Sequence, residues 1–474
     1  MFTSPVIGII AEYNPFHNGH AYQIRRVKAQ FPKAQIVTIM SGSFTQRGEA
    51  AVLDKWQRAE LAVENGSDLV LELPYAFACR SAQHFATGGV RMLSALGCAT
   101  HLAFGAETDH LATLSAIAHA IDSPEIQVAL HTGITDGLPY AAALTSALAA
   151  SFPDCGDLMR QPNNILAIEY LRSISQFAPG LQPLLIPRCG AGYHEQALSC
   201  HYASASGIRS ELAHANPSTS CATTAPDWKA FADVMPQNTL DMLKSIFPSR
   251  YPQQEFLYRA LLARLHVMAE CDLQDTADMR EGLEHRLLRA VRIAASWQEC
   301  LYHLGTRRYP FSSLSRILLH ILMGFTKEEA EHCAACGPAY LRLLAVKAGS
   351  GTSLLHAAKR TAHLPILTKI GKYLNDKERR KPLKDLSPLQ RMLCLDLRAT
   401  ELRELTLPQP DLSSRDYLES PRICTHHIEN STHKRPLCGH CAPALTVNPA
   451  NHAAPAACAL GDLHSKLHAL TAPS

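Results

Sequence analysis

Long hydrophobic runs are missing from this chain of 474 residues, and charged residues are scarce in it. No apolar stretch approaches the roughly 18 residues that span a bilayer, and the N-terminus moves directly into strand-like sequence without a basic leader region. Charged side chains make up 18% of the chain, below the ~25% of an average protein, whereas hydrophobic residues reach 47%. These features exclude a disordered chain, a coiled coil and a collagen-like rod. They predict a cytoplasmic protein with no membrane partner and about two or three domains, at roughly 150 residues per domain.

Cysteine is present in number, but its spacing does not predict a metal site. In a cytoplasmic protein the 15 cysteines are expected to be mostly reduced thiols. Two pairs have the CxxC spacing, Cys333/Cys336 and Cys438/Cys441. The first pair precedes Gly337-Pro338 and is more simply explained as the end of a helix. The second pair could supply two thiolates to zinc, but Cys424 has no nearby cysteine to complete a second pair.

Positive charge is distributed unevenly along the chain, whose formal net charge is only +3. Residues 301–400 contain 17 Lys and Arg against 7 Asp and Glu, whereas residues 101–150 contain no Lys or Arg at all. A basic segment within a near-neutral protein is typical of a surface that faces nucleic acid. A solvated helical face would produce the same charge, so charge alone leaves both interpretations open.

Short apolar runs alternate with helical patterns through the first half of the chain. The run PVIGIIAE at 5–12 is bounded by Pro5 and by Asn14-Pro15, and it is typical of a buried strand. Strands that alternate with helices indicate βαβ units, so the predicted fold class is α/β with a doubly wound parallel sheet. The predicted strands cover 5–12, 35–40, 68–73, 100–104 and 181–188, and the predicted helices cover 19–30, 54–65, 82–96, 161–175 and 204–214.

The second half of the chain has a different pattern. Apolar residues at helical spacing, such as Leu283, Leu287 and Val291, predict that the chain is helical from about 236 to 405. After about 408 the sequence is rich in Pro, Ala, His and Cys and loses this periodicity. We therefore predict three parts: an α/β domain over 1–235, a mostly helical second domain over 236–410, and a poorly ordered tail over 411–474.

The sharpest local feature is the heptapeptide from Asn14 to His20, NPFHNGH, which follows the first predicted strand and opens the first predicted helix. Ligands of doubly wound sheets bind just past the carboxyl ends of the strands, and a helix N-terminus offers free N–H groups to a phosphate there. His17 and His20 are three residues apart, so both can face the phosphates and stabilise charge as pyrophosphate leaves. Two ordinary surface or capping histidines are the alternative interpretation.

Further motifs occur in a fixed order after this one. With G-I-I-A-E-Y-N-P-F-H-N-G-H (8–20), they resemble the HIGH-motif nucleotidyltransferase superfamily and, more narrowly, the bacterial tRNA(Met) cytidine acetate ligase family. The resemblance covers about 1–405. Ser43, Glu195 and Ser206 are mild departures from the usual Asn, Asp and Thr. The other motifs are M-S-G-S-F-T-Q-R-G-E (40–49), D-K-W-Q-R-A-E (54–60), G-S-D-L-V-L-E-L-P (66–74), A-F-G-A-E (103–107), Q-P-N-N-I-L-A-I-E-Y-L (161–171), R-C-G-A-G-Y-H-E (188–195), A-S-A-S-G-I-R (203–209), G-T-R-R-Y (305–309), L-P-I-L-T-K (364–369) and L-C-L-D-L-R-A-T (393–400).

The resemblance implies a Rossmann-like fold and an ATP-dependent ligase. Members of the family activate acetate as acetyl-adenylate, release pyrophosphate, and transfer the acetyl group to the wobble cytidine of elongator tRNA(Met), which gives N4-acetylcytidine. Mg²⁺ on the ATP phosphates is expected, although the sequence has no dedicated carboxylate cluster for it. The expected partners are ATP, acetate and tRNA, and no protein partner is inferred.

The resemblance also assigns the site. His17 and His20 are the expected catalytic residues, and Ser204, Ser206 and Arg209 lie where related nucleotidyltransferases place a second phosphate-contacting motif. The residues expected to bind ATP are Ile10, Ala11, Glu12, Tyr13, Asn14, Pro15, Phe16, His17, Asn18, Gly19, His20, Ala21, Tyr22, Gln23, Gly105, Asn163 and Arg188.

Two other functions remain open on the sequence alone. One is a nucleotidyltransferase that adenylylates a small phosphorylated cofactor precursor with the same histidines. The other is an RNA-binding protein with a vestigial nucleotide site. A basic helical half favours a tRNA substrate, whose backbone would be contacted by some of Arg307, Arg308, Arg316, Lys369, Lys372, Lys377, Arg379, Arg380, Lys381 and Lys384.

Overall fold

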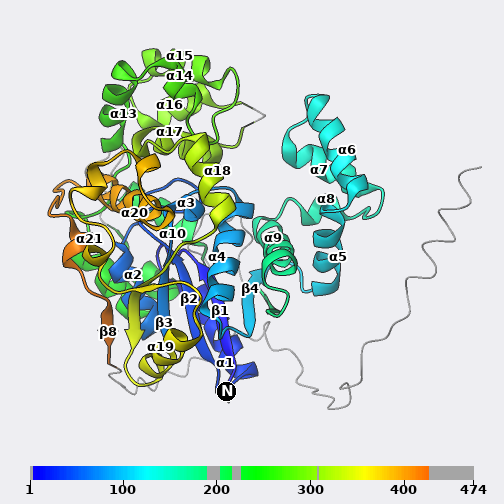
Figure 1. Ribbon diagram of the computed structural model, residues 1–474, viewed down its shortest axis with the longest axis vertical. Coiled ribbons are helices and arrows are strands. Elements are labelled where there is room, and N and C mark those ends of the chain that lie inside the picture. Colours follow the sequence, from blue (N-terminus) through cyan, green and yellow to red (C-terminus); the bar gives the residue numbers. More distant parts are fainter. Residues whose placement is uncertain (1–3, 189–202, 216–225, 307–308, 426–474) are drawn as a thin grey trace, which may run out of the picture. The chain divides into compact units, whose positions relative to one another are not determined.

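A mostly parallel sheet organises the protein, as shown in the computed structural model (Figure 1), which describes residues 4–188, 203–215, 226–306 and 309–425. Within those residues, eight strands form one sheet in the order β5-β4-β1-β2-β3-β6-β7, and β8 pairs with β6. The first five strands in this order, β5, β4, β1, β2 and β3, are parallel to one another, which confirms the predicted α/β class. The strands are β1 (Val6–Ala11), β2 (Gln35–Ser41), β3 (Leu69–Leu73), β4 (His101–Ala106), β5 (Gln182–Pro187), β6 (Leu341–Lys347), β7 (Ile366–Leu367) and β8 (Arg422–Cys424).

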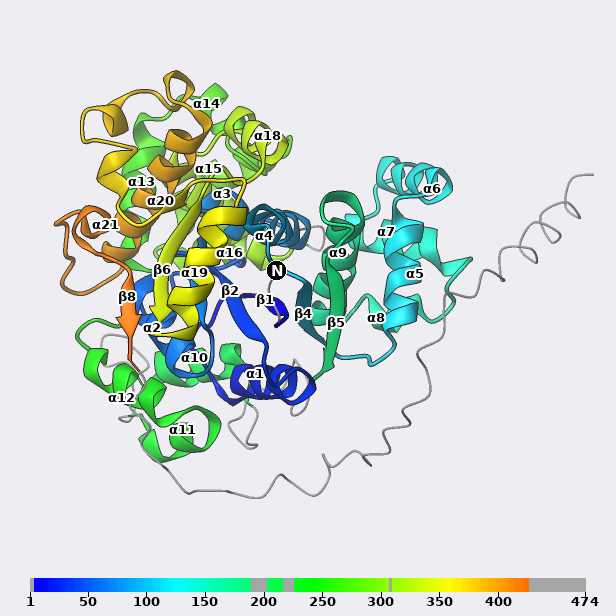
Figure 2. The ribbon, with the colours of Figure 1, turned by 60° about the horizontal axis from the view of Figure 1, so that its bottom comes forward.

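Both faces of the sheet are covered by helices. Successive strand residues point to opposite faces, and in β1 the side chains of Ile7 and Ile9 enter one core while those of Val6 and Ile10 enter the other. This explains why the strand sequence is apolar throughout rather than alternating. Figure 2 shows α1 (Asn18–Gln30) and α4 (Ala82–Leu96) on opposite sides of β1. The other helices next to the sheet are α2 (Lys55–Glu64), α3 (Tyr75–Ala78), α9 (Pro162–Phe177), α10 (Ala205–His214) and α19 (Ser350–Thr361).

The remaining helices form groups around this sheet. The helices α5 (Leu111–Ile121), α6 (Pro124–Thr135), α7 (Tyr140–Ala149) and α8 (Cys155–Leu158) gather beside α9, in cyan in Figure 1. The helices α11 (Trp228–Val234) and α12 (Gln237–Ile246) pack in the same core as α1. The next group contains α13 (Phe256–Val267), α14 (Glu270–Gln274), α15 (Leu283–Ile293), α16 (Trp297–Leu304), α17 (Phe311–Met323) and α18 (Lys327–Cys336). The chain then adds the short helices η1 (Ile370–Lys372), η2 (Glu378–Arg380) and η3 (Leu383–Asp385), followed by α20 (Pro388–Glu404) and α21 (Arg415–Leu418).

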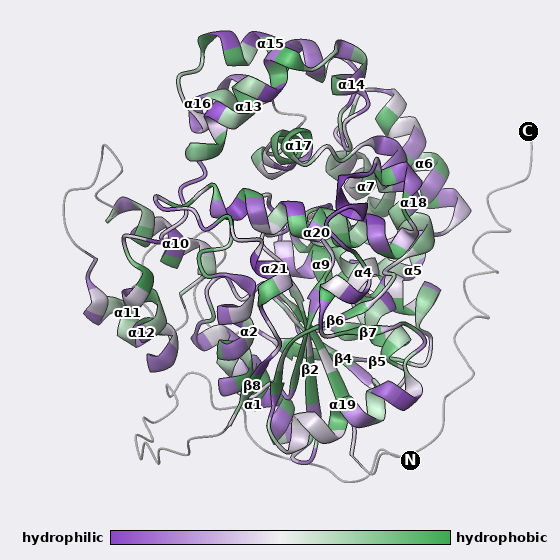
Figure 3. Cartoon of the chain, turned by 60° about the vertical axis from the view of Figure 1, so that its left-hand side comes forward, coloured by the Kyte–Doolittle hydropathy of each residue, from purple (hydrophilic) through white to green (hydrophobic). Residues whose placement is uncertain are grey.

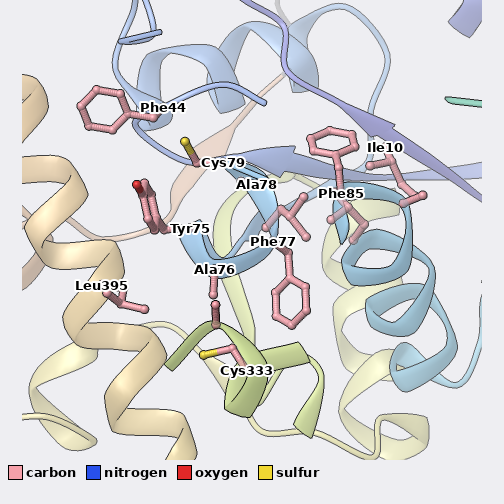
Figure 4. Packing of buried hydrophobic residues seen from close by; sticks show 14 of the residues in the cluster. Ile10, Phe44, Tyr75, Ala76, Phe77, Ala78, Cys79, Phe85, Cys333 and Leu395 are labelled. Carbon is pink, nitrogen blue, oxygen red and sulfur yellow. The ribbon is translucent and has the colours of Figure 1, made fainter. Parts of the chain in front are cut away.

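One hydrophobic core joins the sheet to the helices of the second half. The strands are green along most of their length in Figure 3, whereas the outer helices mix purple and green faces. Tyr75 and Phe77 of α3 lie in the same core as Cys333 of α18 and Leu395 of α20 (Figure 4). The helical half is therefore packed directly on the carboxyl edge of the sheet by way of α3.

Two parts of the chain differ from the sequence prediction. The segment 236–405 was expected to be helical, but β6 lies within it and pairs antiparallel with β3, and β7 extends the sheet beyond β6. Residues 411–425 were expected to belong to a poorly ordered tail, but they contain α21 and β8. Residues 426–474, including Cys438 and Cys441, lie outside the described residues. Cys336 ends α18, which confirms the interpretation of the first CxxC pair.

No helix in the described part of the chain is both long and apolar enough to cross a bilayer.

Candidate active site

The loop that follows β1 is fixed by buried hydrogen bonds at the carboxyl edge of the sheet. Arg58 of α2 is fully buried, and its Nη1 donates to the carbonyl oxygens of Glu12, at 2.7 Å, and Ser41, at 3.0 Å. The Asn14 Oδ1 accepts a hydrogen bond of 2.8 Å from the Val52 amide. Tyr13 has a φ of 48°, in the left-handed region that non-glycine residues rarely occupy. The chain is thus held in a turn that directs the next residues toward α1.

His17 and His20 cap the helix that this loop opens. His17 is the N-cap of α1, and its Nδ1 accepts from the Gly19 amide at 3.0 Å. The Nδ1 of His20 accepts in return from the His17 amide at 3.3 Å, so the two residues form a capping box. A side chain at position 19 would meet the His17 ring at 2.8 Å, which explains the glycine between them. The capping interpretation of the two histidines is therefore correct as far as the helix is concerned.

The same hydrogen bonds leave a chemically active atom on each ring. Burial, together with Arg188 and Arg209, lowers the pKa of His17 to about 3. Burial, His17 and Arg188 lower the pKa of His20 well below its usual value. Both imidazoles are therefore neutral at pH 7, and because each Nδ1 accepts a hydrogen bond, each proton lies on Nε2. The ring centroids are 3.8 Å apart. Two oriented N–H donors are thus side by side at the start of a helix.

The lowered pKa of His17 predicts a pH-dependent stability. The unfolded chain takes up a proton on this residue below pH 6.5, whereas the folded chain does so only near pH 3, so the stabilisation is present above pH 6.5 and is lost as the pH falls. Between pH 7.5 and pH 5.0, the wild-type free energy of unfolding should fall by about 2 kcal/mol more than that of a His17→Asn variant.

Urea unfolding of both proteins at the two pH values measures this difference. Asparagine is a good N-cap, so the variant keeps the start of α1, and the comparison cancels the other titrating groups. Equal pH dependence in the two proteins would mean that His17 titrates normally in the folded state.

Arg209 joins the second predicted motif to this loop. It extends from α10 toward the loop after β1. Its Nη1 donates to the Asn14 carbonyl at 2.9 Å, and its Nη2 donates to the Glu49 carboxylate at 2.7 Å. The hydroxyl of Ser204 caps α10 by accepting from the Gly207 amide at 3.1 Å, and it lies 3.1 Å from the Ser206 hydroxyl. The structure therefore ties Arg209 to the loop that carries the two histidines and gives Ser204 a capping role.

A second group of residues lies at the ends of β4 and β5. Glu107 accepts hydrogen bonds from the Asn163 Nδ2, at 2.5 Å, and from the Asn164 amide, at 2.8 Å, at the start of α9. The Asn163 Oδ1 accepts from the Arg188 Nη1 at 3.3 Å, and a side chain at Gly105 would meet the Arg188 Cγ at 3.3 Å. Arg188 is exposed and also lowers the pKa of both histidines. Arg188 therefore contacts Asn163 and Gly105 and also acts electrostatically on the two histidines.

Other predicted residues contribute their backbone or their packing instead of a free side chain. The side chains of Ile10, Tyr13, Phe16 and Ala21 are buried in the two cores. The rings of Tyr13 and Phe16 pack against His20, with centroids 4.8 and 5.5 Å away. The side chains of three further residues bind protein atoms: Glu12 accepts from the Gln46 amide, Asn18 donates to the Asp233 carbonyl and Gln23 donates to the Ala103 carbonyl. Of the rest, Asn14 and Pro15 are buried, and Ala11, Gly19 and Tyr22 are half-buried.

Three residues that position the site were not singled out by the sequence analysis. They are Glu107, which holds Asn163, Glu49, which holds Arg209, and Arg58, which holds the loops after β1 and β2. Each lies within one of the motifs quoted above, and membership of a motif is the only feature of the sequence that points to them. The positioning role of each residue depends on contacts with segments that are distant in the chain.

The basic residues of the second half fall into two classes. Arg316 is buried and donates to the Gln46 carbonyl at 3.2 Å, so the expectation that it is a surface contact is wrong. Arg379 is half-buried and paired with Glu401 at 2.8 Å. Arg307 and Arg308 lie outside the described residues. The other candidates are exposed: Lys369, Lys372, Lys377, Arg380, Lys381 and Lys384. No group of three or more His, Cys, Asp or Glu in the described ranges is arranged to hold a metal ion.

Comparison with known proteins agrees with this arrangement. The sequence profile of the HIGH Nucleotidyl Transferase family matches residues 4–417. The tRNA(Met) cytidine acetate ligase of Syntrophotalea carbinolica is 36% identical over 425 residues, which cover 88% of this chain and 98% of the relative. The ligase of Syntrophomonas wolfei is 34% identical over 429 residues, which cover 88% of this chain and 99% of that relative. The crystal structure of Thermotoga maritima TmcAL bound with alpha-thio ATP has a TM-score of 0.78 at 28% identity, over 89% of this chain and 100% of that one. The chain therefore belongs to the tRNA(Met) cytidine acetate ligase family of HIGH nucleotidyl transferases.

Proposed function

We propose that this protein is an ATP-dependent ligase that acetylates the wobble cytidine of elongator tRNA(Met). The observation that carries the proposal is the match along almost the entire length of relatives that bear the ligase name. A solved relative bound with an ATP analogue supports ATP as the activating substrate.

The first step would be the activation of acetate. The acetate oxygen attacks the α-phosphorus of ATP, the bond to the β-phosphate breaks, and pyrophosphate leaves with the electron pair of that bond. Acetate is already ionised at neutral pH, so this step needs charge stabilisation more than it needs a base. The Nε2–H groups of His17 and His20 and the guanidinium groups of Arg188 and Arg209 are donors suited to a triphosphate. The edge formed by Gly105, Asn163 and Arg188 would then receive the nucleoside.

The second step would transfer the acetyl group to RNA. The N4 amine of the cytidine attacks the carbonyl carbon of acetyl-adenylate, the bond to the AMP oxygen breaks, and N4 loses a proton. The exposed cations of the helical half support a tRNA-binding role for residues 236–410, with Lys369, Lys372 and Lys377 on or beside the short helices before α20. Contacts of this kind position the backbone and do not read sequence.

Magnesium would be carried by the nucleotide. The described residues contain no metal-binding cluster, so the ATP phosphates would be its principal ligands. The alternative of a small phosphorylated substrate is not favoured, because the relatives that cover nearly the whole chain are named as tRNA ligases.

The proposal is tested by incubating the protein with ATP, Mg²⁺, labelled acetate and tRNA(Met). Mass spectrometry of the digested nucleosides should show labelled N4-acetylcytidine, and this product should be lost when EDTA removes the metal. Acetate-dependent exchange of pyrophosphate into ATP tests the first step alone. Exchange that is stimulated by a phosphorylated metabolite and not by acetate would overturn the proposal.

A further inference from the structure

Exposed aromatic side chains are concentrated in the helices from α13 to α17. Phe256 at the start of α13 is 43% exposed, Tyr302 near the end of α16 is 73% exposed, and Phe311 at the start of α17 is 59% exposed. In the described part of the chain, the only other exposed aromatic side chains are those of Tyr140 and Phe177, which belong to other helices. Packing of the fold does not account for rings that face solvent, so this group of three needs another explanation.

The helix α16, which lies beside α13 and α17 in Figure 3, links the three rings. Its first amide donates to the Glu255 carboxylate at 2.9 Å, next to Phe256. At its other end, a side chain on Gly305 would meet the Phe311 ring at 3.4 Å, and Tyr302 is one turn earlier. Eight residues of helix span about 12 Å. We call Phe256, Tyr302 and Phe311 together the aromatic surface.

The aromatic surface borders the loop between β2 and α2. The Nε2 of Gln254, just before α13, donates to the Gly48 carbonyl at 2.8 Å. The hydroxyl of Ser315, in the second turn of α17, donates to the same carbonyl at 3.0 Å. The next residue of this loop, Glu49, binds Arg209, which in turn binds the histidine loop. A molecule bound on the aromatic surface therefore lies on the side of the protein that leads to the two histidines.

A cavity beside the start of α13 gives this surface depth. It is open to solvent, has a volume of about 560 Å³, and is lined by Glu255, Phe256, Tyr258, Arg259 and Ala295. Small-molecule pockets have volumes of roughly 300–1,000 Å³, so this one has room for a nucleobase. Phe256 offers it a ring, and Arg259 is an exposed cation on the same helix.

The surroundings of the aromatic surface are positively charged. The segment 283–316, which contains α15, α16 and the start of α17, has six arginines and two acidic residues. Arg286 donates to the Gly305 carbonyl at 2.7 Å, which holds a cation at the end of α16. Of the two acids, Glu284 is buried and Glu299 accepts a hydrogen bond from a backbone amide. The local charge therefore suits a polyanion.

Aromatic rings beside cations are the combination with which proteins bind unpaired nucleotides, because the rings stack on bases and the cations contact phosphates. We propose that the aromatic surface stacks with unpaired bases of the tRNA anticodon loop. This inference rests on the proposed tRNA substrate, whose wobble base is in that loop. A second copy of this chain is the alternative partner. A two-fold contact would press the same positively charged surface against itself, so the charge favours RNA.

Leucine variants of the aromatic surface separate stacking from simple apolar contact. Tyr302→Leu and Phe311→Leu keep an apolar side chain and lose the ring, so each should raise the Kd for tRNA(Met) at least about fivefold. Tyr302→Phe and Phe311→Tyr keep the ring and should stay within about twofold of wild type. The slope of log Kd against log salt should not change in these variants, because stacking releases no counterions. Arg259→Gln should instead reduce the magnitude of that slope by about one.

Filter binding with full-length protein measures these Kd values on two RNAs, the anticodon stem-loop and the same stem as a fully paired duplex. The leucine variants should lose affinity for the stem-loop and not for the duplex. Val267→Ala is the matched control, since Val267 is an aliphatic residue of α13 that is 80% exposed, and both affinities should stay unchanged. Acetate-dependent pyrophosphate exchange should equal that of wild type in the leucine variants.

Three results would overturn the aromatic surface as an RNA site. The first is a leucine variant of each position that binds the stem-loop as tightly as wild type. The second is an equal loss of affinity in the variants that keep the ring. The third is a change in the sedimentation coefficient of the RNA-free protein in the leucine variants, which would identify a contact between copies. Wild-type protein without acetate-dependent exchange would instead contradict the proposed function.

Discussion

Replacing His20 with alanine is expected to lower the rate of acetate-dependent pyrophosphate exchange by about 10²–10³-fold, or about 2.7–4 kcal/mol in the activation barrier. The variant removes a neutral imidazole whose Nε2–H is already oriented, because its Nδ1 accepts from the His17 amide. A donor that is fixed before the reaction stabilises developing charge on pyrophosphate without any cost of reorganisation. Binding of tRNA, measured by filter binding, should change less than twofold.

The same substitution also weakens the capping box, so the loss of rate has to be separated from a loss of folding. His20→Ala should cost about 1 kcal/mol of stability. Glutamine at this position can restore the capping box, so His20→Gln should recover the stability and not the rate. His131→Ala, which removes an exposed histidine on α6, should change neither quantity. If exchange and tRNA affinity fell in parallel in His20→Ala, His20 would be structural and the proposed catalytic role would be wrong.

The sequence is sufficient to predict the first five strands because their signals are local. Each is a short apolar run bounded by Pro, Gly or Asn, and each is followed by a helical pattern, as in β1 and α1. The site around His17 is predictable for the same reason, since a helix start after a buried strand has a known use. The hydrogen bonds that the two imidazoles accept at Nδ1 are also local, since the donors are the backbone amides of His17 and Gly19.

The rest of the fold depends on contacts between distant residues. The sequence of β6, LRLLAVK, lies between long helical segments, and its status as a strand is set by β3, about 270 residues earlier in the chain. Neighbours in the sequence do not distinguish a buried arginine from an exposed one, and the burial of Arg316 depends on the Gln46 carbonyl, 270 residues away, that accepts its hydrogen bond. Glu107 belongs to one of the motifs, but its positioning role arises only because α9 begins beside the end of β4, where Asn163 and Asn164 donate to its carboxylate.

The order of the segment after residue 411 also depends on distant residues, in this case through buried ion pairs. Asp416 is 4% exposed, and its Oδ1 lies 2.6 Å from the Lys55 Nζ and 2.6 Å from the Arg342 Nη1. Burial alone would raise the pKa of Asp416, but Lys55 and Arg342 outweigh it and bring the pKa to about 2. Nothing within the tail sequence indicates these partners, which come from α2 and β6.

This buried network leads to the largest expected change in stability. Lys55 is fully buried and binds Glu72, at 2.9 Å, as well as Asp416. Lys55→Met keeps the length of the side chain and removes its charge, which leaves two buried carboxylates with Arg342 as their remaining cation. The free energy of unfolding in urea should fall by about 3–5 kcal/mol, because a buried charge pair that loses one partner retains the desolvation cost of the other.

The origin of this loss can be identified by a control, a double variant and a change of pH. Arg160→Met breaks the exposed pair with Asp157, whose side chains are 81% and 91% exposed, and should cost less than about 0.5 kcal/mol. Adding Asp416→Asn to Lys55→Met removes one of the stranded charges and should recover part of the stability, so the two substitutions should not be additive. In Lys55→Met one carboxylate should have a raised pKa in the folded state, so its stability should fall as the pH rises from 5 to 8. If the loss is below 1 kcal/mol and independent of pH, Arg342 neutralises both acids by itself, and Lys55 contributes only the packing of its buried side chain.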